Sequence, residues 1–198
     1  MKKVLFTVAI AIMVFCTSCV QSLYPLAQKD SQVIFKSELL GKWKESDGTE
    51  YFIDSLGSKK YQVTVVDHNK AGSSEKKFCD TSHFLMSMVN VRGKYFLDCF
   101  PDTSHRTFYQ LGEQTVNFLL PVHYILKVNS IAPDSLEIAA INKQRLVTLM
   151  NQKKFRVGYQ QIGTDQILLF QKPEDLQGKL TELEKFLSAY ETSILWRH

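Results

Sequence analysis

Short runs of alternating apolar and polar residues, separated by turn signals, recur along most of this chain and constrain its fold more than any other feature. The clearest run covers residues 61–65, in which Tyr61, Val63 and Val65 share one face. Alternation with a period of two is typical of a strand that buries one face. About eight such strands, mostly antiparallel, predict a mainly β barrel or sandwich.

The remaining strand-like runs carry the same signals. They cover residues 39–44, 50–53, 78–89, 95–100, 123–128, 136–140, 155–161 and 166–171. Arg92-Gly93 predicts the tight turn of one hairpin, and residues 163–165 predict the turn of a second, last hairpin.

Two segments replace this alternation with helical spacing. Residues 142–153 place Leu146, Leu149 and Met150 on one side, which predicts a short helix before the last hairpin. Residues 173–190 begin with a proline, which suits the first turn of a helix, and continue with apolar residues three or four positions apart. We expect this C-terminal amphipathic helix to pack on the outside of the sheet.

The start of the chain predicts where the protein resides. Two lysines precede 12 mostly apolar residues, and two small residues then lead into Cys19. A basic start, a short apolar core and a small-residue exit make an export signal. Its end resembles the lipobox of bacterial lipoproteins, in which the peptide is cut just before a cysteine that then carries the lipid anchor. The resemblance implies a signal peptide over residues 1–18 and lipidation of Cys19.

Two alternatives stay open for this segment. One is an uncleaved membrane anchor, although the apolar run of 12 residues is shorter than the roughly 20 that span a bilayer. The other is an ordinary secretory signal that leaves Cys19 as a spare thiol. Cys16 stands where the usual lipobox has a large aliphatic residue.

Lipidation implies attachment to the cell envelope. Lipoproteins of this type carry more than one acyl chain, such as palmitate, and two or more chains anchor a protein stably. Val20 follows the cysteine where an aspartate would suggest inner-membrane retention, so the resemblance favours the outer membrane. We expect residues 19–38 to form the lipidated cysteine and a tether, and residues 39–198 to form the domain.

Gly41-Lys42-Trp43 lies at the start of the first predicted strand. It resembles the Gly-x-Trp signature of lipocalins, whose eight-stranded antiparallel barrel is followed by a helix. In that family the tryptophan closes one end of the barrel, and an arginine near the end of the last strand packs over it. Here Lys172 at most takes the place of that arginine. The resemblance implies a lipocalin-like β-barrel with a C-terminal amphipathic helix.

The arrangement also resembles a group of uncharacterised bacterial lipoproteins with a lipocalin-like domain, which has no established activity. The matching pieces are Cys19 and residues 22–26, 39–43, 95–98 and 120–123.

Charge and motifs exclude several functions. Removing residues 1–18 lowers the net charge from +4 to +2, too little to suggest nucleic-acid binding. The separated lysine pairs are most simply solvated turns, although a basic face toward anionic lipid stays open. The five histidines show no metal-ligand spacing, and no nucleophile elbow, P-loop or Cys-x-x-Cys occurs. We therefore expect no metal, no cofactor and no enzyme activity.

Cys79 and Cys99 are predicted to be free, buried thiols. If Arg92-Gly93 is a two-residue turn, Cys99 lies opposite Met86, seven residues from Cys79. That separation is about 23 Å along a strand, whereas the Cα atoms of a disulfide lie within roughly 7 Å.

The candidate ligand-binding residues are Trp43, Tyr61, Val63, Asp98 and His123. For Asp98 and His123 we expect a solvent-facing or hydrogen-bonded structural pair; the alternative is that, buried together, they form a polar spot inside the barrel that orients a ligand. We expect a membrane-anchored, non-catalytic lipoprotein that binds a small apolar molecule or lipid in its barrel. The alternative is a solid-cored module that binds another protein, through its surface or residues 190–196.

Overall fold

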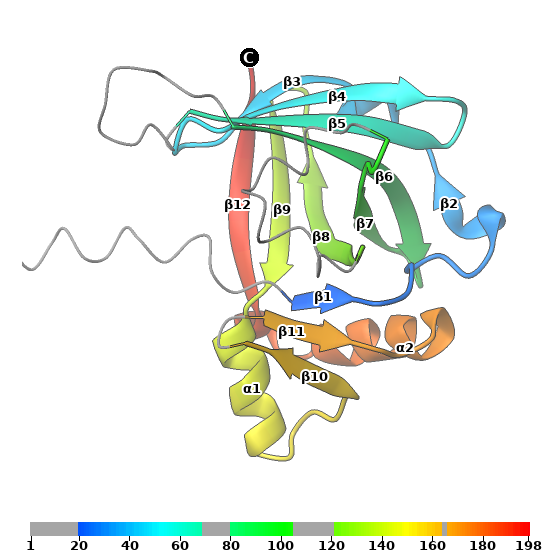
Figure 1. The fold of residues 1–198 in the computed structure, drawn as a ribbon, viewed down its shortest axis with the longest axis vertical. Coiled ribbons are helices and arrows are strands. Elements are labelled where there is room, and N and C mark those ends of the chain that lie inside the picture. The colour runs from blue at the N-terminus through cyan, green and yellow to red at the C-terminus, as the bar shows by residue number, and fades with distance from the viewer. Residues whose placement is uncertain (1–19, 69–79, 105–120, 164–165) are drawn as a thin grey trace, which may run out of the picture.

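The computed structural model describes residues 20–68, 80–104, 121–163 and 166–198 (Figure 1). The strands are β1 (Val20–Ser22), β2 (Val33–Ile34), β3 (Gly41–Lys44), β4 (Glu50–Leu56), β5 (Lys60–Asp67), β6 (Asp80–Val91), β7 (Lys94–Pro101), β8 (His123–Ile131), β9 (Ser135–Ile141), β10 (Tyr159–Ile162), β11 (Gln166–Leu169) and β12 (Tyr190–Arg197). The helices are α1 (Lys143–Asn151) and α2 (Pro173–Leu183), and the 3₁₀ turns are η1 (Asp30–Gln32), η2 (Ser37–Leu39) and η5 (Leu187–Ala189).

Eight of these strands close into an antiparallel barrel. Neighbours in the chain pair from β3 to β9 as an up-and-down meander, and β12 lies between β9 and β3 (Figure 1). Strand β12 pairs with β9 from Tyr190 to Trp196, and with β3 at Lys44 and Trp43. The predicted mainly β fold with an eight-stranded antiparallel barrel is therefore confirmed.

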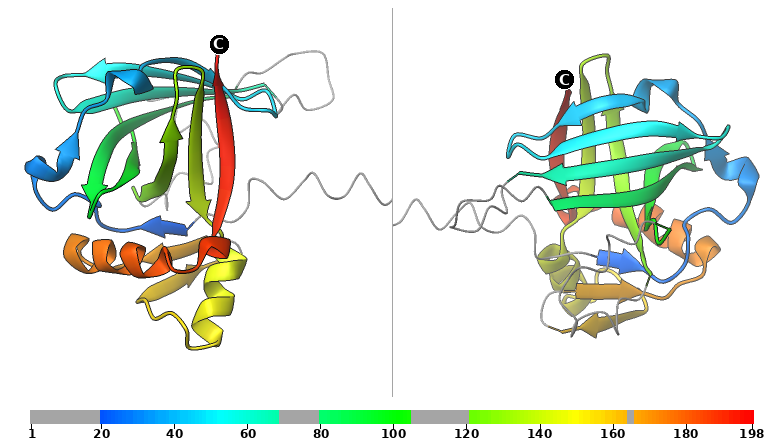
Figure 2. Two further views of the ribbon diagram at one scale, coloured as in Figure 1. Left: turned by 180° about the vertical axis from the view of Figure 1, so that it is seen from behind. Right: turned by 45° about the horizontal axis from the view of Figure 1, so that its top comes forward.

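The meander gives the barrel two different ends, because successive connections alternate between them. The short-turn end carries the turns 57–59, 92–93 and 132–134 together with the C-terminus of β12. The long-loop end carries the connections 45–49, 68–79, 102–122 and 142–189. Both helices and strands β10 and β11 belong to the last of these connections, and both views in Figure 2 group them beside the barrel.

The hairpin predicted at Arg92-Gly93 is confirmed as β6–β7. Val91 pairs with Lys94, and both turn residues have positive φ, 51° at Arg92 and 82° at Gly93. Two such residues make the turn that matches the twist of flanking strands. The register places Cys99 opposite Met86, as predicted, and Cys99 is a free thiol. Cys79 lies outside the described residues.

The C-terminal helix is shorter than predicted, and the last barrel strand is a different one. Helix α2 ends at Leu183, and Leu187, which was expected to continue its apolar stripe, is 77% exposed. Residues beyond it form β12, whose Leu195 points into the barrel while Ile194 and Trp196 point outward. The helical pattern was extended too far because Leu187 and Tyr190 happen to continue its spacing.

The hairpin predicted over residues 155–171 forms, but it lies outside the barrel. Strands β10 and β11 pair antiparallel, and β11 then pairs in parallel with β1. This small sheet joins the barrel where β1 pairs with the first two residues of β8. The short helix before it, predicted over residues 142–153, is confirmed as α1, and Asn142 caps it by accepting the Arg145 N–H.

The segment expected to be a tether is packed against the barrel from Val20 onward. Val20 and Leu26 are buried, and Phe35 stacks on Tyr61 with ring centroids 4.9 Å apart. Strand β2 also pairs with the end of β6 that extends past β5. Residues 20–38 pack against the barrel because their apolar side chains cover its outer surface and one of its ends.

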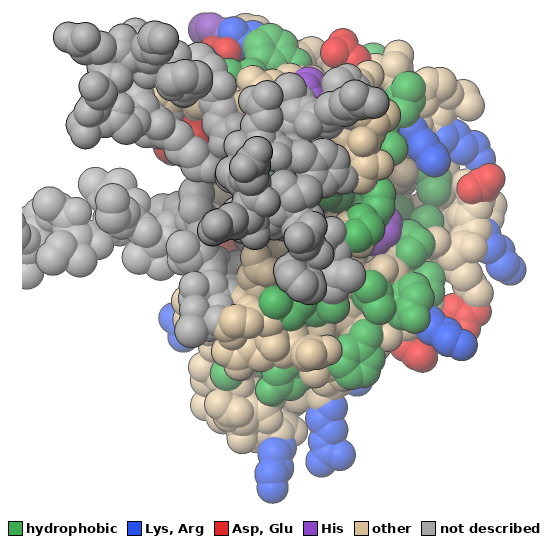
Figure 3. All heavy atoms as spheres, viewed as in Figure 1, with side chains coloured by type: hydrophobic (Ala, Val, Ile, Leu, Met, Phe, Trp, Pro, Cys, Tyr) green, Lys and Arg blue, Asp and Glu red, His purple; other side chains and the backbone are tan. Residues whose placement is uncertain are grey.

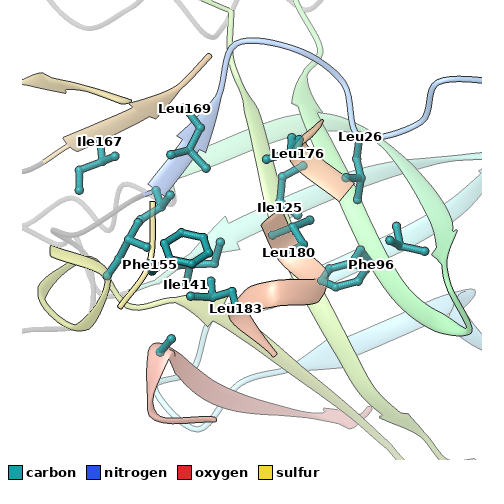
Figure 4. Packing of buried hydrophobic residues seen from close by; sticks show 14 of the residues in the cluster. Leu26, Phe96, Ile125, Ile141, Phe155, Ile167, Leu169, Leu176, Leu180 and Leu183 are labelled. Carbon is teal, nitrogen blue, oxygen red and sulfur yellow. The ribbon is translucent and has the colours of Figure 1, made fainter. Parts of the chain in front are cut away.

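Two apolar clusters stabilise the fold. The inner cluster lies inside the barrel and includes Trp43, Tyr61 and Met88. The outer cluster lies between the barrel wall, the small sheet and the two helices; Figure 4 shows Leu176 and Leu180 of α2 facing it with residues from several other elements. The helices therefore pack on the outside of the barrel, as predicted for the C-terminal one.

Candidate functional site

The barrel interior brings together three of the five candidate residues. Trp43, Tyr61 and Val63 all belong to the inner cluster, with exposed fractions of 0%, 0% and 6%. Their strands β3 and β5 both flank β4, and the period-two alternation points all three side chains inward. The interior is therefore apolar where these residues lie.

The short-turn end of the barrel is sealed around Trp43. The indole N–H donates a hydrogen bond of 2.9 Å to the carbonyl oxygen of Leu39 in η2. The Arg197 guanidinium carbon lies 4.3 Å from the centre of the indole ring. Its N–H groups donate to three backbone carbonyls, those of Glu38, Leu40 and Pro133.

Arg197 is the functional contact that sequence reasoning missed. It occupies the place for which Lys172 was considered, because β12 and not β11 is the last strand of the barrel. The signal that could have found it is the run of three large apolar residues, Ile194, Leu195 and Trp196, just before it, which suits a strand.

Tyr61 holds the N-terminal segment, through Lys36, at the short-turn end of the barrel. Its hydroxyl accepts the Lys36 backbone N–H at 2.6 Å and lies 3.2 Å from the Lys36 carbonyl oxygen, to which it donates. Burial raises the pKa of the Tyr61 hydroxyl, although the hydrogen bond to Lys36 opposes this. This tyrosine therefore serves as a structural polar anchor in an apolar wall.

Some inward-facing side chains toward the long-loop end are partly exposed. Val65, Phe84 and Cys99 pack against the inner cluster but keep partial exposure. The Phe84 ring meets the Tyr124 ring edge to face, with centroids 6.3 Å apart. Apolar and aromatic surface thus lines the interior from the sealed end toward the long-loop end.

Asp98 and His123 do form a pair, but on the outer wall of the barrel and not inside it. His123 Nδ1 lies 2.6 Å from Asp98 Oδ1, and the Leu26 N–H donates to Asp98 Oδ2 at 2.7 Å. Their strand neighbours Phe96 and Ile125 belong to the outer cluster. The expected hydrogen-bonded structural pair therefore forms, the alternative of a polar spot inside the barrel is wrong, and the pair ties the N-terminal segment to β7 and β8.

Cys99 points to the opposite side of the same strand, into the barrel. Burial, and to a lesser degree the nearby Asp98 carboxylate, raise the pKa of its thiol to about 12. A thiol that stays protonated is a poor nucleophile.

A hollow of about 370 Å³ lies on the surface next to the β6–β7 turn. It is lined by Gly93, Lys94, Tyr95, Lys127, Val128 and Asn129. None of the five candidate residues lines it.

The described part of the chain contains neither a metal-binding cluster nor a membrane-spanning helix. No group of three or more His, Cys, Asp or Glu side chains there is arranged to hold a metal ion. None of the helices there has the length and hydrophobicity needed to cross a bilayer. Cys19 lies outside the described residues.

The fold defines the chain as an up-and-down, eight-stranded antiparallel β-barrel protein with two outer helices. No family model, no curated protein and no solved structure matches it.

Proposed function

We propose that this protein is a lipoprotein of the bacterial cell envelope, anchored through Cys19, whose barrel binds a small apolar molecule or a lipid. The proposal includes no catalytic step, cofactor or nucleic acid. It places the protein at the outer membrane in preference to the inner one.

The observation that carries the binding proposal is an apolar barrel interior that is closed at one end by defined contacts. Trp43, Leu39 and Arg197 seal the short-turn end, and the inward-facing Val65 and Phe84 near the long-loop end are partly exposed. A barrel sealed at one end presents its apolar interior only through the other. Eight-stranded barrels are of the size at which the interior either fills or holds one small ligand.

The anchor is supported by the lipobox resemblance at residues 16–19 and by the chain that follows. Val20 begins β1, so a lipid on Cys19 would be attached one peptide bond from the folded domain. The barrel would then be held close to the bilayer that supplies apolar ligands.

Native mass spectrometry of protein extracted from membranes tests both parts of the proposal. We expect the mature chain to begin at a lipidated Cys19 and to carry an additional, dissociable apolar molecule. Sucrose-gradient fractionation of the cell envelope reports which membrane holds it.

A matched pair of variants tests whether the interior is the binding site. Val65 points into the barrel and Val66 points out of it, so Val65→Trp should fill the interior while Val66→Trp should not. We expect Val65→Trp to lower the bound fraction at least tenfold and Val66→Trp to leave it unchanged. Repeated recovery of empty wild-type protein would contradict the binding proposal without affecting the anchor.

One observation favours the alternative of a protein-binding module. Ile194 and Trp196 lie on the outer face of β12 with exposed fractions of 42% and 52%. Large apolar side chains exposed together mark interaction surfaces. This alternative requires that Trp196→Ala abolish a defined complex in membrane extracts while Val65→Trp leaves that complex intact.

A further inference from the structure

The small sheet beside the barrel carries a group of exposed aromatic and aliphatic side chains. Leu23, Tyr24, Tyr159 and Phe170 have exposed fractions of 38%, 40%, 41% and 48%. We call these four residues the apolar patch. Hydrophobic side chains gather over β1 and β11 in Figure 3, and Lys and Arg side chains project from the end of the molecule below them.

Backbone pairing places Leu23, Tyr159 and Phe170 at the same end of the small sheet, with Tyr159 on the face of Leu169 and Phe170 on the face of Gly158. The Leu23 N–H donates to the Leu169 carbonyl oxygen at 2.8 Å, which places Leu23 beside the end of β11. Phe170 directly follows Leu169 in the sequence, and Tyr159 of β10 pairs with Leu169 of β11. The Phe170 ring lies over Gly158, where an added Cβ would come within 2.7 Å of a ring carbon.

A concentration of positive charge adjoins the apolar patch. Residues 142–163, which form α1, the loop after it and β10, contain five Lys or Arg and no Asp or Glu. This basic segment carries more positive charge than the net +2 of the whole mature chain. Arg145, Lys153, Lys154 and Arg156 are exposed and make no ion pair within the part of the chain that the structure describes.

The proposed lipid attachment lies on the same small sheet. Strand β1 starts at Val20, one residue after Cys19, and Leu23 follows its end. Three residues of strand cover about 10 Å, which is shorter than the hydrocarbon core of a bilayer is thick. A bilayer that holds acyl chains on Cys19 would therefore lie within reach of the apolar patch.

We propose that the apolar patch and the basic segment together form the surface that rests on an anionic lipid bilayer. Tyr24, Tyr159 and Phe170 would lie at the headgroup level, where aromatic side chains are enriched. The basic side chains would face anionic headgroups, each contributing to attraction within a Debye length. Of this proposal, only the position of β1 beside the bilayer rests on the proposed lipid anchor.

Docking on this surface has a consequence for access to the barrel. Strand β1 pairs with the beginning of β8, at the long-loop end, and the basic segment belongs to the connection at the same end. The long-loop end would then lie beside the bilayer, and the end sealed by Trp43 would lie away from it. An apolar ligand from the membrane would enter the barrel interior through the long-loop end.

Vesicle binding by the mature chain, residues 19–198 carrying Cys19→Ser, tests the surface without any acyl chain. The probe is vesicles of phosphatidylcholine with one quarter phosphatidylglycerol, compared with phosphatidylcholine alone at the same salt concentration. We expect binding to the anionic vesicles, weakened about thirtyfold by Lys153→Glu with Lys154→Glu, because each basic residue at such a surface contributes roughly fivefold.

The chain offers a matched control for this charge reversal. Lys59, the last residue of the β4–β5 turn, and Lys60, the first residue of β5, form another exposed lysine pair at the short-turn end. Lys59→Glu with Lys60→Glu changes the net charge equally and should leave vesicle binding within twofold of the parent chain. Equal losses from both pairs, or no binding to anionic vesicles, would overturn the proposal. Circular dichroism verifies that both variants fold.

Brominated phospholipids provide a second, independent measurement on the lipidated protein in vesicles. A tryptophan introduced by Tyr159→Trp should be quenched by bromine atoms in the acyl chains, whereas Trp196, exposed on β12 near the short-turn end, should not. Quenching of Trp196 alone would place the wrong face on the bilayer. A native Cys19 found without lipid would refute the anchor and leave the vesicle result for the unlipidated chain unaffected.

Discussion

Arg197 stacks on Trp43, with the guanidinium carbon 4.3 Å from the centre of the indole ring, and the two residues pair directly between β12 and β3. The contact joins the last strand of the barrel to the first. Only two residue pairs connect these strands, so the stacking and the hydrogen bonds of Arg197 supply much of the closure. Barrel integrity therefore depends on a residue one position from the C-terminus.

Replacing Arg197 tests this closure. Arg197→Ala removes three hydrogen bonds to backbone carbonyls and the stacking on Trp43. We expect the free energy of unfolding to fall by about 2–3 kcal/mol, measured by urea denaturation with tryptophan fluorescence. Arg145→Ala is the control, because that side chain is exposed and makes no ion pair in the described ranges. A loss no larger than the control's would show that the closure does not depend on Arg197.

Strand β12 offers two adjacent residues that test its place in the barrel wall. Leu195 is 2% exposed and points inward, whereas Ile194 is 42% exposed and points outward. We expect Leu195→Ala to lower the free energy of unfolding by about 3 kcal/mol and Ile194→Ala by less than about 1 kcal/mol. Thermal unfolding monitored by circular dichroism provides the comparison, and equal losses would contradict the assigned strand.

The local alternation of the barrel strands was readable from the sequence because each strand buries one face. The register at Met86 and Cys99 followed from a two-residue turn alone. The closing strand was not readable, because the residues from Leu187 to Tyr190 fit a helical stripe and nothing local shows that the chain returns to β3. Such a return is decided by pairing between distant segments, which hydrophobic periodicity does not encode.

The candidate site was predicted only in part, for a related reason. Trp43, Tyr61 and Val63 were correctly grouped because alternation within a strand determines which side chains share a face. Asp98 and His123 were correctly expected to form a structural pair, but the sequence left open whether that pair faces the inside or the outside of the barrel. Deciding which face of β7 and β8 is internal requires the outer cluster that α2 and β1 build over Phe96 and Ile125.

The Asp98 carboxylate holds two groups from different parts of the chain. Asp98→Asn leaves an amide whose oxygen can accept from either His123 or the Leu26 N–H but cannot make both charge-assisted bonds. We expect a loss of about 2 kcal/mol and faster hydrogen exchange at the Leu26 amide, measured by NMR. Asp54→Asn, on the exposed part of β4, is the control and should change neither. Unchanged exchange at Leu26 would show that the N-terminal segment is held by packing alone.

Cys99 predicts how stability changes at alkaline pH. Burial raises the pKa of its thiol from 9.0 to about 12, so the unfolded chain loses this proton first as the pH rises. The stabilisation is complete below pH 9 and is lost progressively between about pH 9 and about pH 12, by at most about 4 kcal/mol at 1.36 kcal/mol per pKa unit. The raised pKa values of Tyr61 and Tyr190 act in the same direction from pH 10 upward.

Cys99→Ala separates the thiol from the tyrosines. The variant should be less stable at neutral pH, because a buried side chain is shortened, but its free energy of unfolding should fall less steeply between pH 9 and pH 10, where the tyrosines do not yet contribute. Urea denaturation at half-unit pH steps gives both slopes. Parallel slopes would mean that Cys99 ionises as readily in the folded protein as in the unfolded chain, and would contradict its placement inside the barrel wall.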